Sequence, residues 1–147
     1  MIEFVYDDLL HFEKADYIAQ QVNCQGVMGA GLAKQIRKQH PNVYTDYKTM
    51  CATFEPKKLL GNYIITDNVI SIFGQLNYGY DKSKTYTEYV ALDKAFTDLN
   101  KALPSSKSIA FPYRFGCGLA NGDWRTIMNI IRRCFATRKI YIIVKEK

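Results

Sequence analysis

Short apolar runs alternate along this chain with longer segments in which apolar residues recur at helical spacing. Apolar runs of roughly four to eight residues are typical of buried strands, and recurrence every three or four residues is typical of a helix packed on a core. The runs predict strands at residues 2–6, 17–22, 60–66, 69–73, 108–113 and 140–144. The helical spacings predict helices at residues 32–40, from Pro41 into the early fifties, and at 89–103 and 124–135.

Turn residues separate these predicted elements. Residues 55–58 and 67–68 predict turns, the second of them inside a hairpin of two strands. Residues 74–84 are polar, aromatic and glycine-bearing, and they predict a loop. Thr85 and Glu88 have the spacing of a capping box, which predicts the start of the helix that follows.

The order of these elements predicts the fold class. Strands alternate with helices, and the strands are apolar on both faces, as in sheets that are covered by helices on both sides. A chain of 147 residues is long enough for one domain with a substantial core. We therefore expect an α/β fold, specifically a three-layer α/β/α domain with a mixed central sheet, formed by residues 1–147 as a single domain.

Glycine-rich loops follow two of the predicted strands. Residues 23–31 and residues 114–122 each contain three glycines, and each segment leads into a predicted helix. Ligands of α/β sheets bind at the carboxyl ends of strands, and the free N–H groups of a helix N-terminus bind anions. The first loop matches neither nucleotide-binding glycine fingerprint. Two interpretations therefore remain open: a pair of phosphate-binding loops, or glycines that only satisfy turn geometry.

Charge and composition narrow the possible partners. The net charge of +6 permits an anionic partner, but the basic residues are scattered, which disfavours a polynucleotide-binding surface. The N-terminal segment lacks the features of a signal peptide, and no apolar stretch is long enough to cross a bilayer. We expect a cytoplasmic protein with reduced cysteines and no membrane partner. With two histidines and no CxxC motif, we expect no metal and no cofactor.

Three segments together resemble the macro domain family, which binds ADP-ribose. They are Tyr6–Leu9, Val22–Ala33 and Phe111–Leu119, and the resemblance extends over essentially the whole chain. The third segment resembles the loop of the branch that contains ADP-ribose 1″-phosphate phosphatases and terminal ADP-ribose glycohydrolases. The resemblance implies ADP-ribose or ADP-ribose 1″-phosphate as the ligand, and it allows an ADP-ribosylated macromolecule as a partner.

The resemblance also implies a set of ligand-binding residues. Asp8, with Leu9, matches the site where a carboxylate accepts a hydrogen bond from the adenine amine; the alternative for Asp8 is a turn or helix-cap residue. Asn23 matches the asparagine beside the distal ribose; the alternative is an amide bonded to its neighbouring backbone. The other implied positions are Gly29, Ala30, Gly31 and Leu32 in the first loop, and Tyr113, Arg114, Phe115, Gly116, Cys117 and Gly118 in the second.

The catalytic residues of the glycohydrolases in this branch are missing. Those enzymes use a lysine after a core strand and an aspartate directly after Gly-Cys-Gly-Leu. In this chain the corresponding strand end, residues 72–75, has no lysine, and Ala120 stands in place of the aspartate. Residues 118–124 instead resemble the phosphatase branch, in which an acidic residue precedes a tryptophan. Asp123 is then the candidate base for hydrolysis of ADP-ribose 1″-phosphate, and its alternative role is the N-cap of the next helix. A non-catalytic ADP-ribose-binding module and a hydrolase acting on ADP-ribosylated macromolecules are the alternatives.

Overall fold

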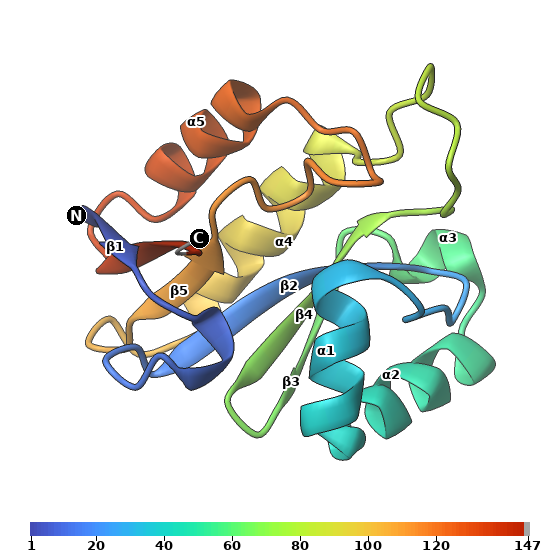
Figure 1. Ribbon diagram of the computed structural model, residues 1–147, viewed down its shortest axis with the longest axis horizontal. Coiled ribbons are helices and arrows are strands. Elements are labelled where there is room, and N and C mark those ends of the chain that lie inside the picture. Colours follow the sequence, from blue (N-terminus) through green and yellow to red (C-terminus); the bar gives the residue numbers. More distant parts are fainter. Residues whose placement is uncertain (146–147) are drawn as a thin grey trace.

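The computed structural model describes residues 1–145, in which one six-stranded sheet lies between two layers of helices (Figure 1). The strands are β1 (Ile2–Tyr6), β2 (Tyr17–Asn23), β3 (Tyr63–Thr66), β4 (Val69–Gln75), β5 (Ile109–Pro112) and β6 (Ile140–Val144). Their order across the sheet is β1-β6-β5-β2-β4-β3. Each neighbouring pair is parallel except β3–β4, which forms the predicted hairpin. The predicted three-layer fold with a mixed sheet is confirmed.

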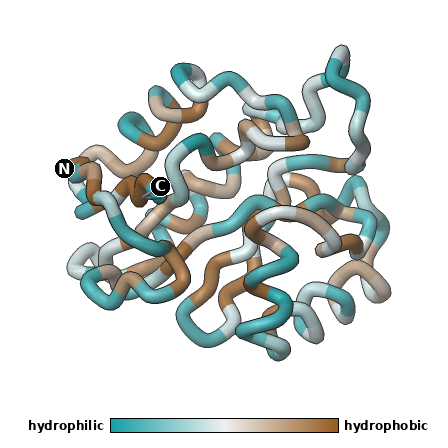
Figure 2. Tube along the Cα trace, in the orientation of Figure 1, coloured by the Kyte–Doolittle hydropathy of each residue, from teal (hydrophilic) through white to brown (hydrophobic). Residues whose placement is uncertain are grey.

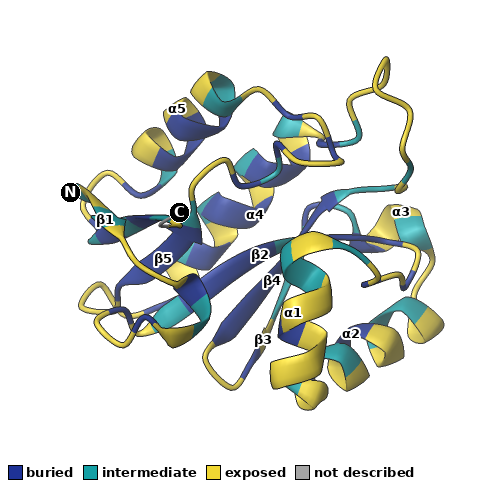
Figure 3. Ribbon diagram, in the orientation of Figure 1, coloured by how far each residue is buried: buried dark blue, intermediate teal, exposed yellow. Residues whose placement is uncertain are grey.

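Each face of the sheet has its own helices and its own core. The helices are the 3₁₀ helix η1 (Leu9–His11), α1 (Gly31–Gln39), α2 (Pro41–Thr53), α3 (Pro56–Leu59), α4 (Tyr89–Ala102) and α5 (Trp124–Cys134). The elements η1, α1, α2 and α3 pack on one face, and α4 and α5 pack on the other (Figure 1). The apolar residues concentrate on the central strands and the inward sides of the helices, and the same positions are buried (Figures 2 and 3).

Several predicted boundaries are corrected by the structure. Residues 55–58, predicted as a turn, contain the start of α3, whose first residue is Pro56; a proline is tolerated there because that N–H has no helical partner. The predicted capping box is wrong: Glu88 is the N-cap residue of α4 and makes no side-chain cap bond. The N–H of Glu88 donates instead to Gly74 O at 2.8 Å, so α4 starts on the end of β4.

The strand order brings three loops to one edge of the sheet. β2 lies between β5 and β4 and is parallel to both, so the carboxyl ends of these three strands point the same way. The two glycine loops follow β2 and β5. A third connection, residues 76–88, follows β4 and stands above the sheet edge in Figure 1; it is called the strap below.

Candidate ligand-binding site

A cavity of about 330 Å³ lies where the two glycine loops and the strap meet. Its volume is in the range of small-molecule sites. Among the described residues that line it, Arg114 is the only charged one, and no carboxylate faces it. The cavity is therefore chemically suited to a ligand that carries negative charge and many hydrogen-bonding groups.

The first loop ends at the N-terminus of α1, which opens onto this cavity. Ala30 is the N-cap residue and supplies no side-chain cap bond. The first helical residues Gly31, Leu32 and Ala33 all line the cavity. Gly31 has φ +56°, and a Cβ placed there would meet no atom within 4 Å. The helix start therefore offers free N–H groups and the positive end of the helix dipole to the cavity.

Asn23 lines the cavity, but its amide is largely committed to its own loop. Its Oδ1 accepts from Gln25 N–H at 2.9 Å and from the Tyr47 hydroxyl at 2.8 Å. Its Nδ2 donates to Val27 O at 2.8 Å. The local backbone role, the alternative considered from the sequence, is therefore present. A second N–H of the amide is left for a ligand, whereas the oxygen is occupied.

Two side chains of the second loop, Phe115 and Cys117, are buried in the core, whereas Tyr113 and Arg114 are exposed. Phe115 packs against Phe96 and Phe111, with ring centroids 6.0 and 5.3 Å apart. Cys117 is also buried, and it is the one predicted residue of this loop outside the cavity lining. Burial raises the pKa of the Cys117 thiol, so it stays protonated and unreactive. Gly116 has φ +74°, and its carbonyl accepts from the Thr87 hydroxyl at 2.6 Å.

The strap forms the third wall, which the sequence did not predict. Tyr78, Gly79 and Tyr80 line the cavity. Asn121 holds the strap to the second loop by donating from Nδ2 to the carbonyls of Lys82 and Lys84, at 2.8 and 3.0 Å. In the sequence, the strap could be recognised only as a polar segment with interspersed tyrosines. That local pattern does not indicate which strand ends the segment covers.

A pair of glutamines on β2, one buried and one half-buried, is the second feature that the sequence did not predict. Gln20 and Gln21 line the cavity from β2, and Gln21 Nε2 donates to Gln75 Oε1 and to the Thr87 hydroxyl, both at 2.9 Å. Two adjacent glutamines inside an otherwise apolar strand were the signal. Gln75 and Ala120 also line the cavity. These two positions are therefore uncharged in this chain. The glycohydrolases of the branch that the sequence resembles carry a lysine at the strand end and an aspartate after the Gly-Cys-Gly-Leu motif.

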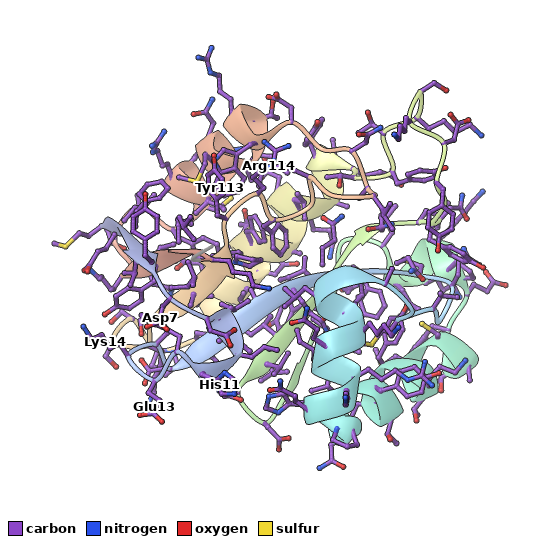
Figure 4. The ribbon with its side chains drawn as sticks, viewed as in Figure 1. Asp7, His11, Glu13, Lys14, Tyr113 and Arg114 are labelled. Carbon is purple, nitrogen blue, oxygen red and sulfur yellow. The ribbon has the colours of Figure 1, made fainter. Side chains whose placement is uncertain are left out.

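Asp8, Leu9 and Asp123 are not among the residues that line the cavity. Asp8 follows β1 and caps η1, accepting from Leu10 N–H at 3.2 Å, and its Oδ2 lies 2.7 Å from His11 Nδ1. Leu9 is buried in the core below. Figure 4 shows the loop after β1, with His11, apart from Tyr113 and Arg114 on the loop after β5.

Asp123 is the N-cap residue of α5. Its Oδ2 accepts from the Thr126 N–H at 3.0 Å and from the Thr126 hydroxyl at 2.7 Å. These bonds hold the pKa of the exposed Asp123 carboxyl below its usual value of 3.8. The cap role considered from the sequence is therefore present, and the catalytic role stays a prediction.

Residues 1–145 offer neither a metal-binding cluster nor a membrane-spanning helix. They contain no group of three or more His, Cys, Asp or Glu side chains that could hold a metal ion. None of the helices in that range is long and apolar enough to cross a membrane.

Comparison with known proteins places the fold. No family model matches the chain. The DNA ADP-ribosyl glycohydrolases of Mycobacterium tuberculosis and Mycobacterium bovis are each 27% identical to it over 137 residues, which cover 86% of this chain and 36% of theirs. The chain thus spans about a third of the length of these relatives.

Solved structures with the same architecture include several macrodomains. The macrodomain of Mycobacterium tuberculosis DarG superposes with a TM-score of 0.78 at 21% identity, over 100% of this chain and 99% of that one. The macrodomain of Thermus aquaticus DarG gives 0.76 at 19% identity, over 97% of both chains. Thermosipho africanus DarTG in complex with ADP-ribose gives 0.76 at 21% identity, over 97% of this chain and 41% of that one. The chain has the macrodomain fold.

Proposed function

We propose that this chain binds ADP-ribose in the cavity between the β2 and β5 loops, either free or attached to a macromolecule. The observation that carries the proposal is the convergence of two glycine loops and the uncapped start of α1 on one cavity whose charged lining residue is Arg114. Backbone N–H groups and a guanidinium are the usual partners of phosphate oxygens. The same fold in Thermosipho africanus DarTG, solved in complex with ADP-ribose, supports this choice of ligand.

The proposed ligand orientation takes the residue roles that the resemblance implies and is compatible with the strand order. The diphosphate lies between the backbone at Gly31 and Gly116, and the distal ribose lies beside Asn23, which offers one N–H. The adenine extends toward Asp8 at the end of β1. β1 is three strands from β2, or roughly 14 Å at the usual strand spacing, so an extended dinucleotide-like ligand is required to reach both.

Gly31 provides the test of the phosphate site. Gly31→Glu places a carboxylate in the open space where the diphosphate is proposed to lie. Two unit charges roughly 4 Å apart near a protein surface repel by about 4 kcal/mol, so we expect ADP-ribose affinity to fall by about 3 kcal/mol or more in calorimetry. Gly31→Ala is the matched control: it carries the same backbone strain at φ +56° but neither the bulk nor the charge.

The two Gly31 variants separate a binding defect from a folding defect. We expect Gly31→Ala to keep most of the affinity, while both variants lose similar stability because both adopt the left-handed conformation. Normal binding by a folded Gly31→Glu variant would mean that the phosphate groups do not approach this helix start, and the proposed site would be wrong.

Hydrolysis of ADP-ribose 1″-phosphate is the second candidate function. It is favoured by the place of Asp123 directly after the second loop and by a cap that uses only its Oδ2. The reaction would need Asp123 to orient or deprotonate a water near the terminal phosphorus. The lowered pKa of the exposed Asp123 carboxyl makes it a weak base, so this reaction ranks below binding alone.

Phosphate release decides between the binding module and the phosphatase. Asp123→Asn keeps a cap acceptor but removes the base, so a phosphatase should lose roughly 10²–10⁴-fold in rate while ADP-ribose affinity and melting temperature change little. A wild-type protein that binds ADP-ribose but releases no phosphate is a binding module. Turnover that persists in Asp123→Asn would instead assign the chemistry to another group.

Removal of ADP-ribose from DNA is the activity for which the mycobacterial relatives are named. For this chain that reaction has less support, because Gln75 and Ala120 supply neither an ammonium nor a carboxylate to the cavity. We therefore propose that an ADP-ribosylated macromolecule is a partner held by the cavity, not a substrate that is cleaved. Incubation of ADP-ribosylated DNA with the protein is expected to give binding without release of ADP-ribose.

A further inference from the structure

A tyrosine hydroxyl lies in the protein interior directly beside the start of the first glycine loop. Tyr47, on α2, is fully buried, and its ring stacks on Phe73 of β4 with 5.8 Å between centroids. Its hydroxyl accepts a hydrogen bond from Gly26 N–H at 3.1 Å. It donates toward Asn23, whose backbone O and Oδ1 lie 2.6 and 2.8 Å away. One oxygen thus joins both ends of the turn that leaves β2.

Asn23 extends this connection along the loop. Its Oδ1 also accepts from Gln25 N–H at 2.9 Å and weakly from Val27 N–H at 3.4 Å, and its Nδ2 donates to Val27 O at 2.8 Å. Gly26 has φ +81°, a conformation that the absence of a Cβ permits. Val27 and the glycines that follow line the cavity, whereas Tyr47 does not.

We propose that Tyr47 is a positioning residue for ligand binding: from the core, it holds the loop after β2 in the conformation that presents its backbone to the cavity. The inference rests on the proposed function, because it takes ADP-ribose as the ligand. A glycine loop that is ordered before binding does not have to lose its freedom when the ligand arrives, and the ligand therefore binds more tightly. Removal of the hydroxyl leaves Gly26 N–H without its partner and frees the turn.

Tyr47→Phe removes the hydroxyl oxygen and keeps the ring on Phe73. The matched control is Tyr44→Phe, which removes the same atom one turn earlier on α2, where the ring lies 3.8 Å from the Arg37 guanidinium. We expect Tyr47→Phe to weaken ADP-ribose binding about tenfold, the effect of leaving a buried hydrogen-bonding group without its partner, and Tyr44→Phe to change it less than about twofold.

Amide hydrogen exchange in the ligand-free protein supplies the second readout. In Tyr47→Phe the amides of Gly26 and Val27 should exchange faster than in the wild type. The amide of Phe73, which donates to Asn62 O at 2.9 Å within the sheet region, should not change. A purely structural role for Tyr47 would move both sets of amides together, because it would lower the stability of the whole fold.

The outcomes separate this inference from the proposed function. If amide exchange at Gly26 and Val27 is unchanged in Tyr47→Phe, the positioning role is overturned, whether or not ADP-ribose binds. Faster exchange in the loop with an unaltered affinity for ADP-ribose overturns the positioning role as well. If Tyr47→Phe also loosens the sheet, Gly26→Ala decides, since it strains the same turn at φ +81°, while its added Cβ would come no nearer than 3.4 Å to a neighbouring side chain. Unaltered affinity in Gly26→Ala would then overturn the positioning role. A wild-type protein that does not bind ADP-ribose refutes the proposed function instead.

Discussion

At the scale of single residues, the ionic state of Asp8 is set by its neighbour on η1. The hydrogen bond between Asp8 and His11 Nδ1, at 2.7 Å, is the main cause that holds the pKa of Asp8 below its usual value of 3.8. Because its pKa is lowered on folding, the carboxylate contributes its full stabilisation when the pH is above its pKa in the unfolded protein. That contribution is lost as the pH falls through its pKa in the folded protein. Asp8 should thus remain a hydrogen-bond acceptor throughout the neutral and mildly acidic range.

Asp8 provides the test of the adenine end of the site. We expect Asp8→Ala to weaken ADP-ribose binding by about 1.5–3 kcal/mol in calorimetry, because a charged hydrogen bond to the adenine amine is lost. Asp7→Asn is the control, since it keeps an acceptor for the Asp8 N–H, which donates to Asp7 Oδ1 at 2.7 Å, and removes a charge that is not predicted to contact the ligand. A carboxyl titration by NMR should also show the Asp8 pKa rising toward 3.8 in His11→Ala. Equal affinities of the Asp8 and Asp7 variants would remove Asp8 from the site.

At the scale of elements, the C-terminus of α4 depends on one buried arginine. Arg138 is 3% exposed, and its guanidinium donates to the carbonyls of Asn100, Leu103, Pro104 and Lys107 at 2.7–3.1 Å. The last carbonyls of a helix have no partner within the helix, and here the planar guanidinium bonds two of them, those of Asn100 and the C-cap residue Leu103. This contact anchors α4, which supports the second loop through Phe96.

Arg138→Lys should therefore destabilise the protein by about 3 kcal/mol, because an ammonium cannot reach all of these carbonyls and leaves some of them buried and unpaired. Denaturant unfolding measures the loss. The exposed Arg132 on α5 offers a control in which the same exchange should change stability by less than about 0.5 kcal/mol. Similar midpoints for the two variants would show that the guanidinium bonds add little.

At the scale of the whole molecule, ligand binding should appear as stability. A ligand that binds only the folded state at about 100 times its dissociation constant adds about 2.7 kcal/mol to the free energy of unfolding. For a chain of this size the melting temperature should rise by about 5–10 °C with ADP-ribose. Gly31→Glu should show no such rise. A wild-type melting temperature that ADP-ribose leaves unchanged would contradict binding in the cavity.

Local sequence patterns were sufficient to predict most strands and helices, the fold class and the two glycine loops. Apolar runs such as residues 17–22 and helical spacings such as residues 124–135 are local patterns, and the strands and helices appear close to the predicted positions. The cap positions of Asp8 and Asp123 were also foreseeable, because a cap bond reaches only two or three residues along the chain.

Long-range packing set which residues share the cavity. Gln21 meets Thr87 across 66 positions, and Tyr47 meets Asn23 across 24. The first contact depends on the strap, which returns over the ends of the central strands, and the second depends on the packing of α2 on the sheet. Local periodicity indicates whether a residue is buried, but it does not indicate which residues pack against it. The site is made by loops that meet only after distant strands have paired, so its walls depend on the complete fold.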